Sequence, residues 1–163
     1  MDEFALIERY FRRPDRPPRD SVVLGPGDDA ALLLPPAGEE LVMTLDTSLG
    51  GHHFPDDLPA ADVGHRCLAV NLSDLYAMGA RPLWFLLSVT LPEADEAWLA
   101  GFAQGMFDLA DRAGIELVGG DVTRGPLSVS IQATGRVARG QAVRRAGARV
   151  GQRLAIGGVP GQG

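Results

Sequence analysis

Two helix-length segments set among short apolar strands place the tightest constraint on how this chain can fold. Residues 59–79 begin at a proline and close at Gly79, and residues 95–114 close at Gly114, as helices commonly do. About seven short segments with strand-like patterns surround them, among them 40–47, 82–92, 115–121 and 127–137. This mixed order predicts an α/β or α+β domain without internal repeats.

Composition narrows the class of protein further. The chain has 163 residues, 45% hydrophobic and 22% charged, which is enough for one domain with a real core. No apolar run approaches the roughly 20 residues that span a bilayer, so no membrane partner is expected. The net charge of −6 disfavours binding to nucleic acid. An acidic, amphipathic N-terminus and a single cysteine predict a cytoplasmic location.

Two familiar kinds of site are disfavoured by residue type. All fifteen basic residues are arginines, which rules out a P-loop lysine, Schiff-base chemistry and a Ser-x-x-Lys nucleophile. A zinc site is also disfavoured, because His65 and Cys67 are two positions apart on a helix and do not face one another. Adjacent histidines such as His52 and His53 are usually surface residues, although His53 lies close enough to Asp46 to reach a substrate.

Asp74 occupies an unexpected position in the first long helix. Cys67 and Val70 lie seven and four residues before it, and Ala77 and Met78 lie three and four residues after it, so all share one helical face. That spacing predicts that Asp74 sits in the apolar stripe of the helix. An unpaired carboxylate is costly to bury, so the side chain should have a partner.

Other acids fall near predicted turns and strand ends. Alternation in 40–47 puts Thr44 and Asp46 on one face, with Asp46 closing the strand. Asp121 closes 115–121, after two glycines that would leave the backbone open to a phosphate. Asp28 and Asp29 follow a "GPG" turn and should point to opposite sides if that segment is extended.

These carboxylates, with a threonine oxygen and no Cys or His cluster, suit a hard cation such as Mg²⁺. Several carboxylates around Mg²⁺ commonly serve phosphoryl transfer. Other interpretations stay open for single residues: an aspartate after glycine is often only a solvated turn residue, and Asp74 could accept from neighbouring amides. The residues alone therefore predict an acidic metal site beside a loop that can accept phosphate.

Four longer motifs carry a resemblance. The segments "LGPGDDAALL", "TLDTSLGGHHF", "AVNLSDLYAMGARPLWFLLSVTLP" and "LVGGDVTRGPLSVSIQATGRV" resemble, in order and spacing, the thiamine-monophosphate kinase family. The similarity runs from residue 3 to the end. That family shares a superfamily with aminoimidazole ribonucleotide synthetase and selenophosphate synthetase. Its members transfer a phosphoryl group from ATP to thiamine monophosphate, giving thiamine diphosphate, by direct in-line attack with Mg²⁺.

The resemblance also implies an architecture. Residues 1–147 would form the N-terminal domain, a mixed sheet with helices on one face whose strands join those of a second copy in a barrel-forming homodimer. Residues 148–163 would be the first strand and turn of a truncated C-terminal domain. Because further metal ligands lie in that missing domain, and Gln162 stands where relatives carry an acid, the chain alone is expected to have little kinase activity.

Site residues follow from the resemblance position by position. His53 matches a contact to thiamine monophosphate, Arg145 matches a contact to ATP, and no residue matches a general base, so no catalytic residue is assigned. Gly120 and Asp121 match the contact to the ATP phosphates. The positions that match magnesium ligands are Asp29, Thr44, Leu45 (through its backbone oxygen only), Asp46, Asp74 and Asp121.

Three alternatives remain. The chain could be a non-catalytic dimerisation module, another ATP-using enzyme of the same superfamily, or an unrelated acidic metal-binding protein. Selenophosphate synthesis is disfavoured, because it needs a reactive Cys or selenocysteine with a lysine, and Cys67 lies in mid-helix.

Overall fold

A computed structural model describes residues 3–158 of the chain, and the two long helices and the sheet are where the sequence places them. No helix among these residues is long and apolar enough to cross a membrane. The elements are α1 (Glu3–Leu6), the π-helical turn η1 (Ile7–Phe11), β1 (Val22–Leu24), β2 (Leu32–Leu33), β3 (Glu39–Leu49), α2 (Ala60–Ala77), β4 (Arg81–Leu91), α3 (Glu96–Ala113), β5 (Glu116–Arg124), β6 (Ser128–Ala138) and the 3₁₀ turn η2 (Arg145–Gly147).

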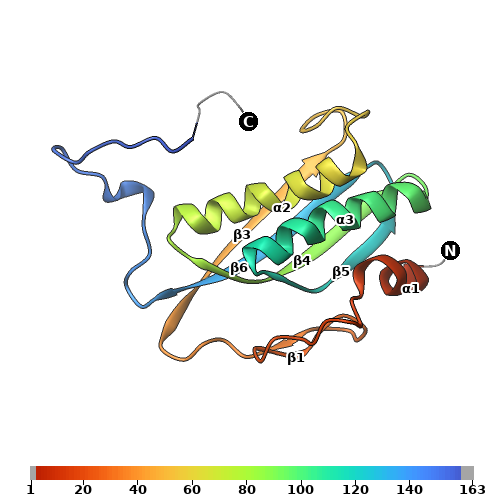
Figure 1. The fold of residues 1–163 in the computed structure, drawn as a ribbon, viewed down its shortest axis with the longest axis horizontal. Coiled ribbons are helices and arrows are strands. Elements are labelled where there is room, and N and C mark those ends of the chain that lie inside the picture. Colours follow the sequence, from red (N-terminus) through yellow and green to blue (C-terminus); the bar gives the residue numbers. More distant parts are fainter. Residues whose placement is uncertain (1–2, 159–163) are drawn as a thin grey trace.

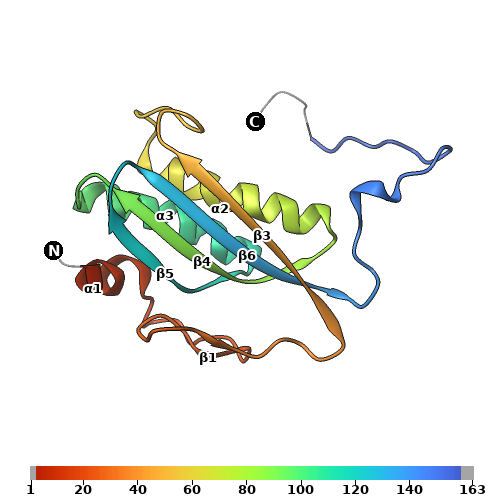
Figure 2. The same ribbon diagram turned by 180° about the vertical axis from the view of Figure 1, so that it is seen from behind.

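The main sheet has four strands in the order β3-β6-β4-β5. β6 is antiparallel to both of its neighbours, whereas β4 and β5 run parallel and are connected by α3. Both long helices lie on one face of this sheet, and the opposite face has no helix over it (Figures 1 and 2). The predicted mixed α/β architecture with helices on one face is therefore confirmed.

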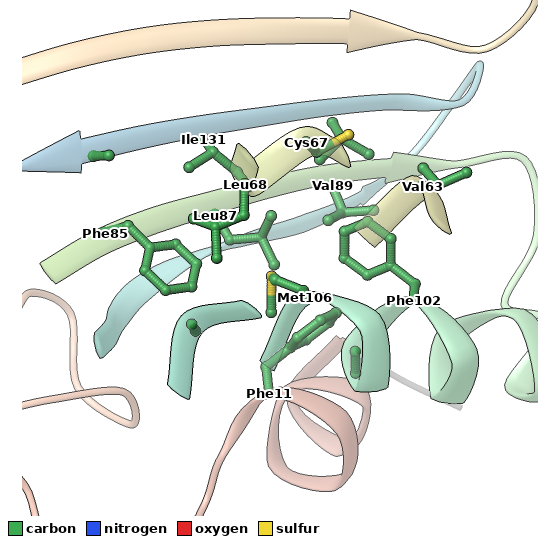
Figure 3. Close-up of a cluster of buried hydrophobic side chains, with 14 of the residues drawn as sticks. Phe11, Val63, Cys67, Leu68, Phe85, Leu87, Val89, Phe102, Met106 and Ile131 are labelled. Atoms are coloured by element: carbon green, nitrogen blue, oxygen red, sulfur yellow. The ribbon is translucent and has the colours of Figure 1, made fainter. Parts of the chain in front are cut away.

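The core fills the space between the sheet and the two helices. Phe85, Leu87 and Val89 of β4 and Ile131 of β6 point toward the helices, where Phe102 and Met106 of α3 meet them (Figure 3). All six are 3% exposed or less. Burying such side chains contributes on the order of 2 kcal/mol each, so this layer provides most of the drive to fold.

The N-terminal segment is anchored to α3 by charge as well as by packing. Phe11 of η1 meets Phe102 edge-on, with ring centroids 6.4 Å apart. Arg13 donates to both carboxylate oxygens of Asp111, at 2.8 and 3.0 Å, and Arg16 donates to the same carboxylate. The Arg13 hydrogen bond holds the pKa of Asp111 below its usual range. The stabilisation from this anchor is therefore present at neutral pH and is lost when acid protonates Asp111.

Two predicted elements differ from the structure. The amphipathic pattern of residues 2–12 predicts a short helix, but this segment is a single α-helical turn followed by the π-helical turn η1. The expected strand after residue 148 does not form in the described part of the tail, which makes a turn at residues 149–152 and then has no regular secondary structure through residue 158; Val150 and Leu154 are exposed. A strand needs a neighbouring strand for its backbone hydrogen bonds, and within residues 3–158 no strand pairs with this segment. Residues 159–163 lie outside the described part.

α2 and α3 pack so closely that their backbones touch. A methyl group added at Gly64 would lie 2.1 Å from the Phe102 carbonyl oxygen, and one added at Gly105 would lie 1.9 Å from the Ala61 carbonyl oxygen. No side chain fits in either place. The two glycines thus set the distance between the helices.

We expect Gly105→Ala to lower the free energy of unfolding by roughly 2 kcal/mol or more, because overpacking outweighs the better helix propensity of alanine. Gly101→Ala, on the same helix, is the matched control: its methyl would lie 3.3 Å from the Ala60 Cβ and needs only a small adjustment. Urea unfolding of both variants checks this, and equal midpoints would contradict it.

Candidate functional site

A direct contact joins the edge strand β3 to α2 at two of the predicted metal ligands. The Thr44 hydroxyl donates to Asp74 Oδ2 at 2.7 Å. Asp74 is exposed, so the expectation that it lies within the buried stripe is wrong. That stripe consists of Val63, Gly64, Cys67, Leu68, Asn71, Leu72 and Leu75. Asp74 lies at its margin because α2 overlies the edge of the sheet, where no further strand covers it.

Asp46 lies on the same face of β3 as Thr44, two residues further on, and is half-buried. The next residue on that face, Ser48, is buried beside Cys67 of α2; burial raises the pKa of the Cys67 thiol, and its interaction with Ser48 lowers that pKa by less. β3 continues to Leu49, so Asp46 lies within the strand instead of closing it as predicted. Thr44, Asp46 and Ser48 therefore form one row facing α2.

Asp121 lies elsewhere. It also falls within its strand, since β5 continues to Arg124. Its neighbour Val122 is buried in the core beneath the helices, so alternation places Asp121 on the opposite, open face, paired with Ser88. Three strand spacings, about 14 Å, separate β5 from β3. A single chain therefore does not bring Asp121 to Asp46 and Asp74. Among residues 3–158, no three His, Cys, Asp or Glu side chains are close enough to hold a metal ion.

The glycine before Asp121 has a structural reason that the sequence did not reveal. Gly120 has φ +155°, and a methyl group there would lie 1.8 Å from the Leu87 carbonyl oxygen of β4. At Gly119 a methyl would meet only the end of the Leu86 side chain, at 3.2 Å. Gly120 is thus required by the close approach of β5 to β4, whatever it contacts in addition.

The remaining predicted residues are dispersed and exposed. Asp29 follows Asp28 in a bend between β1 and β2, where the Asp28 carboxylate accepts from the Asp29 backbone N–H at 2.8 Å, so the extended arrangement considered for them does not occur. Leu45 points to the open face and is 65% exposed. Arg145 lies exposed in η2, beyond the last strand.

His53 has a defined tautomer. It lies in the turn after β3, and its Nδ1 accepts from the Leu49 backbone N–H at 3.0 Å. A ring nitrogen that accepts carries no proton, so in this arrangement Nε2 carries it. The exposed Nε2–H can therefore donate to an anionic group.

Sequence reasoning missed Asn71, one turn before Asp74 on α2. Its side chain is fully buried, and Nδ2 donates to the Cys67 carbonyl oxygen at 3.0 Å. The signal was present in the sequence, because Asn71 is four residues after Cys67 and three before Asp74 and so shares their face. In the sequence alone Asn71 cannot be distinguished from other polar residues of a helix, so periodicity did not single it out.

The donor set between β3 and α2 fits a hard divalent cation. Thr44, Asp46 and Asp74 offer only oxygens, two of them from carboxylates, which is the chemistry that Mg²⁺ prefers. Two surface cavities, of about 490 and 370 Å³, lie elsewhere and are lined by none of the predicted metal ligands. We therefore locate the candidate site at the β3–α2 contact because of the oxygen ligands that meet there. The cavities in the surface do not reveal this site.

Comparisons with known proteins agree with this fold. Residues 27–137 match the family model of the AIR synthase related protein, N-terminal domain. The chain belongs to this family, whose domain here comprises the mixed sheet and its two covering helices.

The relatives of this chain include thiamine-monophosphate kinases. The chain is 48% identical to the Escherichia coli enzyme over 159 residues, 98% of this chain and 49% of that protein. It is 57% identical, with TM-score 0.78, to the crystal structure of the enzyme from Stenotrophomonas maltophilia, over 88% of this chain and 45% of that one. A structure of AaThiL complexed with AMPPCP and TMP matches at 30% identity and TM-score 0.66, over 71% and 38%. The chain spans about half the length of the curated relatives it matches.

We expect Gly120→Ala to destabilise the chain by roughly 2 kcal/mol or more, because the methyl would collide with the β4 backbone at a φ that alanine rarely adopts. Gly119→Ala should cost less than about 1 kcal/mol, since only a flexible leucine end must move. Thermal unfolding of the two variants measures this difference. A larger loss for Gly119→Ala would contradict the account.

Proposed function

We propose that this chain is the metal- and nucleotide-binding half of a thiamine-monophosphate kinase, which transfers the γ-phosphoryl group of ATP to thiamine monophosphate. The observation that carries the proposal is the hydrogen bond between Thr44 of β3 and Asp74 of α2, with the Asp46 carboxylate on the same face of β3. The 48% identity to the Escherichia coli enzyme and the likeness to the AMPPCP and TMP complex support the choice of substrates.

Each residue would then have one task. Thr44, Asp46 and Asp74 would hold Mg²⁺, which when bound offsets the charge of the ATP phosphates. Gly120 with Asp121, and separately Arg145, would contact the nucleotide. Asp29 and the Leu45 carbonyl oxygen would complete the ligands. Exposed on its 3₁₀ turn, Arg145 suits phosphate by charge and fork geometry.

The chemistry asks little of a general base. The attacking oxygen belongs to a phosphate that is already ionised, so positioning and charge neutralisation carry the reaction. His53 would contribute to positioning, because it is exposed and its Nε2–H could donate to the substrate phosphate while the Leu49 backbone N–H holds Nδ1. Accordingly, we assign no acid–base residue.

We further propose a homodimer formed through the open face of the sheet, acting in the cytoplasm. Apolar side chains on that face are 38% to 65% exposed, which is unusual for strands of a folded domain: Leu41, Met43, Leu45, Leu49 and Leu86. Asp121 lies on this same face, apart from Asp46 and Asp74. A second copy laid on this face would bury the apolar side chains and complete the surroundings of Asp121.

The tail is consistent with a longer polypeptide. Residues 148–158 leave the domain and turn at residues 149–152, with the apolar side chains Val150, Leu154 and Ile156 exposed (Figure 1). We propose a domain boundary near residue 147. Beyond it the chain would begin a C-terminal domain like the one in the half of its relatives that the match does not cover. A dimerisation module without catalysis is the alternative, and it is favoured by the exposed apolar face alone.

Binding of AMPPCP to this chain should depend on Mg²⁺, and Asp46→Asn should weaken it at least tenfold, about 1.4 kcal/mol, because a charged ligand becomes neutral. Isothermal titration calorimetry with and without Mg²⁺ measures this. Asp15→Asn is the control, since Asp15 is an exposed carboxylate in the loop after η1. Binding that Mg²⁺ does not affect would favour the dimerisation module.

Met43→Glu should convert the dimer to a monomer, because it buries a charge in the proposed interface. Leu154→Glu, an equally apolar-to-acidic change in the tail, should leave the dimer intact. Sedimentation equilibrium across a concentration series distinguishes these results. A wild-type chain that stays monomeric throughout would refute the interface.

A further inference from the structure

Asn71 has a buried oxygen without a hydrogen-bond partner. Its side chain is 0% exposed, Nδ2 is committed to the Cys67 carbonyl, and Oδ1 has no partner within residues 3–158. An unsatisfied buried carbonyl costs about 1–3 kcal/mol. The other unpartnered buried side-chain atom in this part of the chain, Arg136 Nε, belongs to a guanidinium already paired with Glu39 at 2.9 Å, so the amide oxygen is the less satisfied of the two.

Two contacts fix where Asn71 lies relative to β3. Cys67, Asn71 and Asp74 follow one another at spacings of four and three along α2, so they share a face. Cys67 interacts with Ser48, and Asp74 accepts a hydrogen bond from Thr44 at 2.7 Å. Asn71 therefore lies on the helix between two contacts with β3.

The residue of β3 between those contacts is Asp46. It lies midway between Thr44 and Ser48 on the same face of the strand. The middle of the β3–α2 contact thus combines the carboxylate of Asp46 with the unpaired amide oxygen of Asn71, and Asp74 and Thr44 lie one step away.

From this juxtaposition we propose that Asn71 Oδ1 is a further ligand of the divalent cation held by Thr44, Asp46 and Asp74, an inference that rests on the proposed function. An amide carbonyl is a hard oxygen donor that adds no negative charge. It would complete the cation's surroundings on the buried side, where a third carboxylate would be costly. The cation in turn would satisfy the oxygen that the protein leaves unpaired.

The test separates this role from a purely structural one. A structural asparagine with an unpaired oxygen can be replaced by leucine of similar shape without loss, or with a gain, in stability. We therefore expect Asn71→Leu to keep or raise the melting temperature without metal, and to bind Mn²⁺ at least tenfold more weakly than wild type in the presence of AMPPCP. Calorimetry and Mn²⁺ electron paramagnetic resonance give the affinity.

Two further variants make each outcome decisive. Asn71→Asp should raise Mn²⁺ affinity above that of wild type and show a larger rise in melting temperature on adding Mn²⁺, since it supplies a charged oxygen at the same place. Wild-type affinity in Asn71→Leu, together with lost affinity in Asp46→Asn, would overturn the role of Asn71 alone. Unchanged affinity in Asp46→Asn would overturn the cation site and the proposed function with it. If Asn71→Leu does not fold, Asn71→Asp decides alone: affinity no higher than wild type overturns the inference.

Discussion

The backbone contact between α2 and α3 is the constraint on which the rest of the structure depends. Gly64 and Gly105 let each helix approach the carbonyl oxygens of the other, so the pair covers the sheet as one closely packed layer. With α3 fixed over β4 and β5 by its large core side chains, α2 can only lie over the other half of the sheet, above β6 and β3. The helix–helix contact thereby sets the position of the face of α2 that meets Thr44 and Asp46.

The edge position of β3 explains how acids can gather there. A carboxylate beneath the centre of a helix layer would lose its hydration, whereas at the margin Asp74 stays exposed and Asp46 half-buried. Water access lowers the repulsion between the two, and the Thr44 hydroxyl supplies a hydrogen bond to one of them. The same margin leaves room for a ligand to approach from solvent. The fold therefore tolerates these charges where they are useful and keeps the rest of the layer apolar.

Sequence periodicity predicted which residues share a face, and there it succeeded. Pro59, Gly79 and Gly114 gave the helix limits to within a few residues, and a period of two placed Thr44 and Asp46 together. Periodicity gives no information on where a helix rests on a sheet, so the exposure of Asp74 was missed. Nor does it give strand pairing: the separation of Asp121 from β3 and the need for Gly120 beside Leu87 both depend on a neighbouring strand. The burial of Asn71 and its unpaired Oδ1 are likewise properties of packing, because they depend on the elements that surround α2.

The strand order has a consequence for how the chain acquires this structure during synthesis. β6 is the last strand of this sheet to leave the ribosome, yet it lies in the middle of the sheet, between β3 and β4. Until residue 138 has emerged, β3 has no sheet partner, and its pairing with β6 must then bridge about ninety residues of chain. Such non-local closure is entropically slow, so the sheet closes late. The β3–α2 contact, and any ligand bound to it, can therefore stabilise the domain only after almost all of its sequence has been translated.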